Sequence, residues 1–214
     1  MKIRKTELLA VLLVILSFGA ALYFYNIMPD KFASHWNIQG QVDGYMSKFW
    51  GLFMMPFISL GMLILFFALP RIDPLKKNIE DFRNYYDWFI ILILLFLVYI
   101  YKLTILWNLN YKFNMGQMLI PAFAVLFFYS GILLEKSKMN WFIGIQTPWT
   151  LSSESVWEKT HKLGGLLFKI SAVLSLVGVA FPSYAFYFVL GPIILSTIYI
   201  VYYSYAEYSK ENRM

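Results

Sequence analysis

The fold is decided by residues 163–206, LGGLLFKISAVLSLVGVAFPSYAFYFVLGPIILSTIYIVYYSYA, in which Lys169 is the one charged residue. A helix needs about 20 residues to cross about 30 Å of hydrocarbon, so this stretch is too long for a single crossing. Pro182 provides a break, because proline disfavours helical backbone at the residue before it. The stretch therefore predicts two transmembrane helices, at 163–181 and 184–206.

The chain upstream contains four more segments that are apolar over the length of a membrane span: 8–28, 50–69, 88–107 and 114–134. Hydrophobic residues make up 60% of the 214 residues and charged residues 14%, whereas soluble domains contain about 25% charged residues. These values exclude an ordinary soluble enzyme and a disordered protein. We predict an all-α polytopic membrane protein with six transmembrane helices.

The first predicted span follows a short basic segment, Lys2, Arg4 and Lys5, as the apolar core of a secretory signal peptide does. Its apolar stretch is longer than such a core, and no clean small-x-small cleavage site precedes Asp30. We therefore expect this span to be retained as a helix.

Lysine and arginine are distributed unevenly over the loops, and this predicts the orientation, since cytoplasmic loops carry an excess of both. Most of the 18 lie in the amino-terminal segment, residues 70–87, residues 135–162 and the carboxyl-terminal segment. The remaining loops carry Lys31, Lys48 and Lys112. We expect both termini to be cytoplasmic, in a multi-pass protein of the plasma membrane. The net charge of +6 then reflects topology, and no direct contact with nucleic acid is expected.

The predicted outer loop that is richest in polar residues and glycine contains HWNIQGQVDGYMSK, residues 35–48, which we call the outer motif. Its segments 37–40 and 42–45 have the composition of turns, with glycines free to take positive φ. The side chains of His35, Asn37 and Asp43 could form a polar cluster there. Such a cluster fits a recognition surface, a weak metal site or a hydrogen-bonded cap over the helix ends. One histidine and one aspartate are too few for a conventional metal site, so we expect no metal and no cofactor.

A second segment, NWFIGIQTPWTLSSESVWEKTH at residues 140–161, lies in an inner loop and is called the inner motif here. Pro148 disfavours helix at Thr147, so we expect irregular backbone over 140–150. Ser152 or Ser153 is a candidate N-cap for a helix that continues into the fifth span. On that helix Trp157, His161, Gly164 and Phe168 share one face, and Gly164 and Gly165 permit close approach of another helix.

Both motifs resemble the SdpI family of bacterial and archaeal membrane proteins, named for the immunity protein against a Bacillus sporulation-delay toxin. The outer motif resembles the uncharacterised amino-terminal domain often found in this family. The inner motif resembles the family segment Gly-x-Arg-Thr-Pro-Trp-Thr-Leu-Ser, followed by Trp and Thr-His. Gln146 stands where relatives commonly have arginine, so a role that rests on that cation does not carry over.

The resemblance implies a non-enzymatic immunity or sensor protein that protects the cell against a secreted, membrane-active peptide toxin. In the Bacillus case it also implies capture of a transcriptional repressor at the membrane. We expect three partners: the lipid bilayer itself, a peptide toxin outside the cell and a transcriptional repressor in the cytoplasm. The candidate toxin-recognition residues are His35, Trp36, Asn37, Gly40, Asp43, Gly44 and Lys48. The candidate residues for holding the bundle together or docking a cytoplasmic partner are Asn140, Gly144, Thr147, Pro148, Trp149, Thr150, Leu151, Ser153, Glu154, Trp157, Thr160 and His161.

The domain division that we expect places an amino-terminal pair of spans in residues 1–87 and a four-span SdpI-like region in residues 88–214, within one membrane domain. The 70–87 segment has apolar residues at helical spacing. It fits either an amphipathic helix on the inner leaflet or an extension of the third span.

An alternative function is a membrane enzyme or small-solute transporter that uses a polar cavity near residues 147–161. In an enzyme, His161 would be a base supported by Glu154 or Glu158, with Ser152 or Ser153 as nucleophile. A transporter needs charged residues deep in the spans. Lys102 and Lys169 are the charged residues within the spans, and both are expected near span ends, where their side chains can reach the interface.

Overall fold

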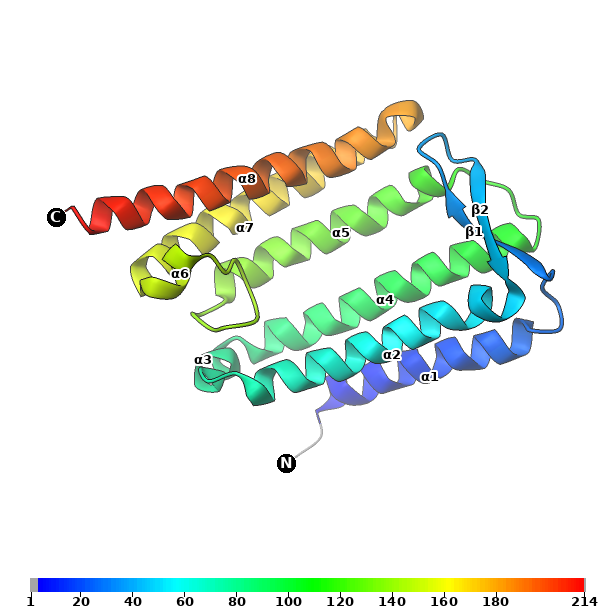
Figure 1. The fold of residues 1–214 in the computed structure, drawn as a ribbon, viewed down its shortest axis with the longest axis horizontal. Coiled ribbons are helices and arrows are strands. Elements are labelled where there is room, and N and C mark those ends of the chain that lie inside the picture. The colour runs from blue at the N-terminus through cyan, green and yellow to red at the C-terminus, as the bar shows by residue number, and fades with distance from the viewer. Residues whose placement is uncertain (1–3, 214) are drawn as a thin grey trace.

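The computed structural model describes residues 4–213 and contains a bundle of long helices with a β-hairpin at one end (Figure 1). Within those residues, six helices are long and apolar enough to cross a membrane, and each overlaps one predicted span. Their bounds are α1 (Lys5–Phe24), α2 (Lys48–Ile72), α4 (Arg83–Asn108), α5 (Met115–Lys136), α7 (Glu154–Val177) and α8 (Ala185–Glu211). A 3-10 turn at Pro182–Tyr184 precedes α8, as expected of the break at Pro182. The chain is a multi-pass, all-α membrane protein; Lys2, in the predicted basic segment, lies outside the described residues.

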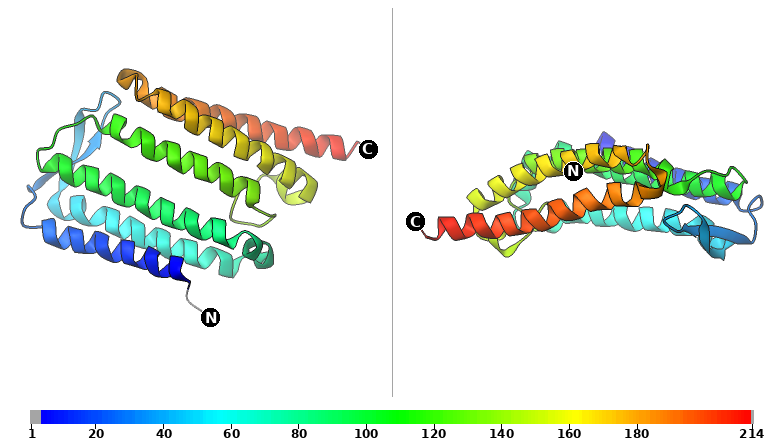
Figure 2. Two further views of the ribbon diagram at one scale, coloured as in Figure 1. Left: turned by 180° about the vertical axis from the view of Figure 1, so that it is seen from behind. Right: turned by 90° about the horizontal axis from the view of Figure 1, so that it is seen from above.

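The long helices form two groups, α1 with α2 and α4, and α5 with α7 and α8, joined where α4 packs against α5 (Figure 1). The bundle is a flattened slab when seen from above (Figure 2). Helix α1 begins and helix α8 ends at the end of the slab that carries the short helices α3 (Lys76–Asp81) and α6 (Pro148–Ser152), and we call it the termini end (Figure 1). The opposite end carries the hairpin and is called the hairpin end. The predicted division near residue 87 stays a prediction.

Helices α5 and α7 approach each other closely at two glycines. A Cβ atom at Gly131 would lie 2.6 Å from the carbonyl oxygen of Gly165, and one at Gly165 would lie 2.7 Å from that of Gly131. These distances are too short for any side chain, so glycine at both positions lets the backbones touch. The expectation that Gly165 permits close approach of another helix is therefore confirmed, and that helix is α5.

The hairpin at the hairpin end was not predicted from the sequence. Strand β1 (Lys31–Trp36) pairs antiparallel with β2 (Val42–Ser47). The expected turn at 37–40 is present, with Gly40 at φ +77°, but the expected turn at 42–45 is wrong because these residues lie in β2. The register shifts next to His35, and a Cβ at Gly44 would lie 2.8 Å from the Cβ of His35. Asp43 and Gly44 thus serve a bulge rather than a turn.

The 70–87 segment combines features of both alternatives raised for it. Helix α3 is a separate short helix, and α4 begins at Arg83 and carries the chain directly into the third span. Ile79 and Phe82 are buried and pack with Tyr86 in the core between α1, α2 and α4. Ile79, Phe82 and Tyr86 therefore face the bundle, whereas Ile72 is 60% exposed.

Charged residues form a network where α1 meets the start of α4. The Arg83 Nε atom lies 2.7 Å from Asp87 Oδ1, and Arg4 Nη1 lies 3.0 Å from Asp87 Oδ2. Thr6 donates a hydrogen bond of 3.1 Å to the same Asp87 oxygen, and Glu7 lies 3.5 Å from Arg83. The side chains of Arg83 and Asp87 are 9% and 4% exposed, so each needs the other to compensate for lost hydration.

Candidate functional site

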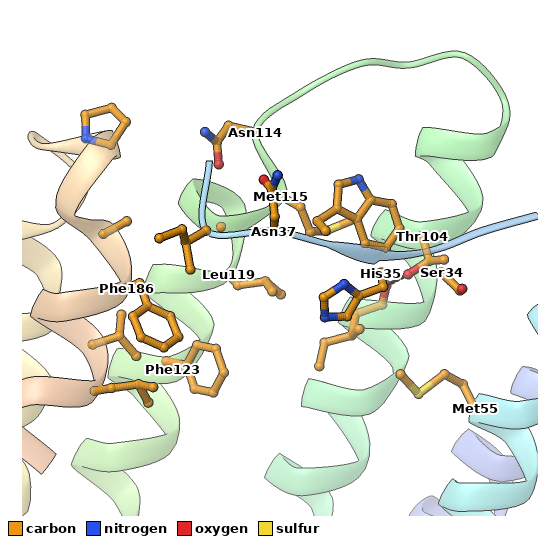
Figure 3. Close-up of a pocket in the computed structure, with 18 residues that line it drawn as sticks. Ser34, His35, Asn37, Met55, Thr104, Asn114, Met115, Leu119, Phe123 and Phe186 are labelled. Atoms are coloured by element: carbon orange, nitrogen blue, oxygen red, sulfur yellow. Dashed lines mark hydrogen bonds between the residues drawn. The ribbon is translucent and has the colours of Figure 1, made fainter. Parts of the chain in front are cut away.

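A cavity of about 490 Å³ lies beneath the hairpin, between α4, α5 and α8 (Figure 3). Its roof is formed by residues 34–38 of the hairpin and by Asn114, which precedes α5. Apolar side chains form the walls: Met55, Ile100, Leu119, Phe123, Phe186 and Val189. The site thus has a polar roof over apolar walls, which is the arrangement of a pocket for an amphipathic ligand.

His35 hangs from β1 into the space above the helices (Figure 3). Its Nδ1 atom lies 2.5 Å from Asp43 Oδ1, across the hairpin. The two side chains are 71% and 45% exposed, so the pair is accessible from outside the fold. Asp43 fixes the orientation of the imidazole, and Gly44 leaves room for it; these three predicted residues act as one unit.

Asn37 and Trp36 hold the hairpin tip against the helices. The Asn37 side-chain oxygen accepts hydrogen bonds from the backbone N–H groups of Gln39 and Gln41, at 3.0 and 2.9 Å, which closes the turn. The Trp36 ring packs edge-on against Trp107 at a centroid distance of 5.6 Å. Gly40 lies against Asn114, since a Cβ there would be 2.9 Å from the Asn114 Cγ atom.

Lys48 is separate from the cavity, at the other end of the hairpin. Its Nζ atom lies 2.7 Å from Asp30 Oδ1, and this hydrogen bond holds the pKa of Asp30 below its usual value. The structure therefore brings His35, Trp36 and Asn37 to the cavity, with Asp43, Gly44 and Gly40 supporting them.

Two asparagines that the sequence did not single out complete the hairpin end. The Asn108 carboxamide accepts from the backbone N–H of Ala33 at 2.8 Å and donates to its carbonyl at 3.0 Å, as a neighbouring strand would. Nothing in the sequence around Asn108 signals this contact. Asn114 caps α5 by accepting from the N–H of Gln117 at 3.1 Å, and its Asn-x-x-Gln spacing is a recognisable capping signal.

The inner motif at the termini end is held together by its own side chains, beginning with Asn140. The side chain of Asn140 is fully buried. Its oxygen accepts from the N–H groups of Phe142 and Ile143 at 3.0 and 2.6 Å, and its nitrogen donates to the carbonyl of Lys138 at 2.8 Å. Gly144 follows with φ +129°, a conformation that side chains strongly disfavour.

Helix α6 begins at Pro148, so the expectation of irregular backbone over the whole of 140–150 is wrong. Proline suits the first helical position because its missing N–H is not needed there. Thr147 caps the helix by accepting from the Thr150 N–H at 3.1 Å, and Thr150 Oγ1 accepts from the Thr147 N–H at 2.9 Å. Thr147 also bonds Ser204 of α8 at 3.1 Å, which ties the motif to the last span.

Contacts with α8 also involve Trp149 and Ser153. The Trp149 ring packs against Tyr205 at a centroid distance of 5.2 Å. Ser153 is the N-cap of α7, as one of the two expected candidates, and accepts from the Val156 N–H at 3.3 Å. Its hydroxyl also lies 2.7 Å from Glu211 Oε2.

His161 joins the inner loop to α7 through both ring nitrogens. Its Nδ1 atom lies 2.8 Å from the carbonyl oxygen of Trp157, and its Nε2 atom accepts the N–H of Ile145 at 2.8 Å. The imidazole stacks on the Trp157 ring at 3.8 Å, and Trp157 Nε1 donates to the carbonyl of Ser137 at 3.1 Å. With both nitrogens bonded to backbone, neither is available to remove a proton from a substrate in this conformation.

The other inner-motif residues divide by exposure. Thr160 is buried, and its hydroxyl has no hydrogen-bond partner within residues 4–213. Leu151 is half-buried, whereas Pro148, Glu154 and Gln146 are exposed. The motif thus combines exposed residues with a buried, hydrogen-bonded interior.

A second cavity, of about 590 Å³, lies at the termini end, and Glu154, Glu158 and His161 all line it. The alternative enzyme or transporter hypothesis predicted that these three residues converge. The hydroxyls proposed as nucleophiles are directed elsewhere, because Ser152 bonds the carbonyl of Pro148 at 2.6 Å and Ser153 bonds Glu211. His35 in β1 and His161 near the start of α7 share no centre, because these two parts of the chain lie at opposite ends of the bundle (Figure 1).

Comparisons with known proteins match both motifs. Residues 136–204, which contain the inner motif, match the SdpI/YfhL protein family. Residues 12–60, which contain the outer motif, match a domain of unknown function, DUF1648. The resemblance to the SdpI family is confirmed. Over 210 residues the chain is 22% identical to "Immunity protein SdpI" of Bacillus subtilis (strain 168), covering 97% of this chain and 98% of that protein.

The SdpI-like segment contains α6 and α7 and most of α8, and the amino-terminal match contains the whole hairpin. Each matched region therefore contains one of the two structured motifs together with helices that span the bundle. No solved structure matches the chain.

Proposed function

We propose that this protein is an immunity or sensor protein that protects the cell from a membrane-active peptide toxin by binding it, without catalysis. The observation that carries the proposal is the cavity beneath the hairpin, with a polar roof and apolar walls, in a chain similar over its whole length to an immunity protein. An amphipathic peptide offers the complementary surfaces. Its apolar side chains would enter between α4, α5 and α8, and its polar groups would meet His35 and Asn37.

The orientation belongs to the same proposal: both termini are cytoplasmic, and the hairpin end faces the outside of the plasma membrane. The basic loops support it, since most lysines and arginines lie at the termini end. A toxin that inserts into the outer leaflet then meets the cavity laterally, without crossing the membrane.

The inner motif has a structural part in this proposal. Asn140, Thr147, Trp157 and His161 use their polar groups inside the protein, so they hold α7 and α8 against the inner loop. A cytoplasmic repressor would have to bind the exposed residues of the same loop, such as Gln146 and Glu154.

A toxin-challenge assay tests the function. Toxin-sensitive cells that lack their own immunity gene would express the intact chain, the His35→Ala variant or the Gln39→Ala variant, which alters an exposed side chain on the same hairpin outside the cavity. We expect survival with the intact chain and with Gln39→Ala, and reduced survival with His35→Ala at equal membrane abundance. Equal killing with and without the intact chain would remove the immunity proposal.

The alternative of a transporter or enzyme rests on the termini-end cavity. The Glu154→Gln/Glu158→Gln double variant separates the two functions, because both carboxylates line that cavity and lie far from the hairpin. Immunity through the hairpin end predicts undiminished protection. Loss of protection by this variant, at normal membrane abundance, would favour the alternative.

A further inference from the structure

The roof of the cavity beneath the hairpin contains side-chain amides whose N–H groups are unused. The Asn37 oxygen accepts two backbone N–H groups, and the Asn114 oxygen accepts one. These bonds fix the orientation of both amides, because a reversed amide would place its NH₂ group against another donor. Neither amide nitrogen has a hydrogen-bond acceptor within residues 4–213, and both residues line the cavity.

His35 adds a third polar group to the same roof. Asp43 occupies its Nδ1 atom, which leaves Nε2 for a ligand. An imidazole that carries a hydrogen on Nε2 would donate a hydrogen bond from that atom. The amides of Asn37 and Asn114 lie near each other at the roof, whereas the His35 imidazole lies lower, beside α4 and about level with Leu119 (Figure 3). The roof is thus suited to a group that accepts several hydrogen bonds.

The walls below are open to the lipid-facing surface of the bundle. Phe186 lines the cavity and is still 49% exposed, and its neighbour Tyr187 on α8 is 60% exposed. The apolar wall therefore runs without interruption onto a surface that lipid tails cover. The volume of about 490 Å³ is within the range of small-ligand pockets, about 300–1,000 Å³.

We propose that this cavity binds a phospholipid of the leaflet at the hairpin end, with an acyl chain between α5 and α8 and the phosphate under the hairpin. The phosphate oxygens accept hydrogen bonds from the amides of Asn37 and Asn114. A phospholipid combines an apolar chain with an anionic acceptor and enters from the side on which the cavity opens. The site is independent of the toxin proposal, but a toxin that uses the cavity must displace the lipid.

Native mass spectrometry of the purified chain tests the proposal, with phosphatidylglycerol and a diacylglycerol of the same chains as probes. The variants Asn37→Asp and Asn114→Asp keep the accepting oxygen, so the turn and the helix cap persist, but each replaces a donor by an anion. Asn110→Asp is the matched control, because Asn110 is exposed at the same end and outside the cavity. A charge-assisted hydrogen bond corresponds to about a tenfold difference in affinity or more.

We expect one phosphatidylglycerol per chain, retained at least about tenfold better than diacylglycerol. Retention should fall by about tenfold in Asn37→Asp and in Asn114→Asp and stay unchanged in Asn110→Asp. Equal retention of the two probes, or equal retention by all variants, would overturn the phosphate contact. A dimer that persists without lipid and is lost in Leu119→Trp would place a second copy in the cavity and overturn the proposal, as would the absence of any bound lipid.

Discussion

Two ion pairs of equal length allow a direct test of how burial determines the contribution of an ion pair to the free energy of unfolding. Arg83–Asp87 and Lys138–Asp81 both have a nitrogen–oxygen distance of 2.7 Å. The side chains of the first pair are 9% and 4% exposed, and those of the second are 57% and 54% exposed. We predict that Asp87→Ala lowers the free energy of unfolding by about 3 kcal/mol, because it leaves the Arg83 guanidinium buried without its main partner. Asp81→Ala should lower it much less, since water replaces the lost partner.

The assay is unfolding of the purified protein by SDS in mixed micelles, followed by tryptophan fluorescence. The double variant Arg83→Met/Asp87→Ala provides a further comparison, because it removes both buried charges. Its loss of stability should be smaller than that of Asp87→Ala alone, since no charge is then left unpaired at this point. Glu7 keeps part of the network through Arg71, at 3.9 Å.

The reasoning would be refuted by equal losses in Asp87→Ala and Asp81→Ala. It would also be refuted if the double variant were less stable than Asp87→Ala, because the main effect would then lie in packing and not in the uncompensated charge.

Two further predictions concern the packing of the long helices and the inner motif. Gly131→Ala should destabilise the protein by about 1–3 kcal/mol in the same assay, because its Cβ would meet the carbonyl of Gly165, whereas Gly61→Ala, which faces open space, should change stability by no more than about 1 kcal/mol. His161→Phe preserves a stacked ring but leaves the Ile145 N–H without its acceptor. We expect the free energy of unfolding to fall by about 1–3 kcal/mol and proteolysis of the 137–147 loop to become faster. Unchanged cleavage would contradict the anchoring role of His161.

The six spans could be predicted because a membrane crossing requires a long apolar run, and such runs are visible in the sequence. Pro182 also marked the one break inside a continuous run. The caps at Ser153 and the turn at 37–40 were predictable for the same reason, since each depends on residues within a few positions of one another.

The contact of the hairpin with α4 and the charge network were not predictable, because both depend on partners far away in the chain. Strand β1 is completed by Asn108, which is 75 residues away from Ala33. In the sequence Asp87 stands at the end of the charged 70–87 segment. In the structure it is bonded to Arg4, which lies 83 residues earlier in the chain. His161 suggested a catalytic base because a sequence does not show that backbone groups already occupy both of its nitrogens.

Photo-crosslinking in cells tests the central claim most directly, that the cavity beneath the hairpin receives the toxin. A photoreactive residue would replace Leu119, in the cavity wall, or Ile64, which is 62% exposed on the lipid-facing side of α2. During toxin challenge of protected cells we predict an adduct between the peptide and the chain labelled at Leu119, and none from Ile64. Protected cells that give no adduct at Leu119, or equal adducts at both positions, would contradict the account.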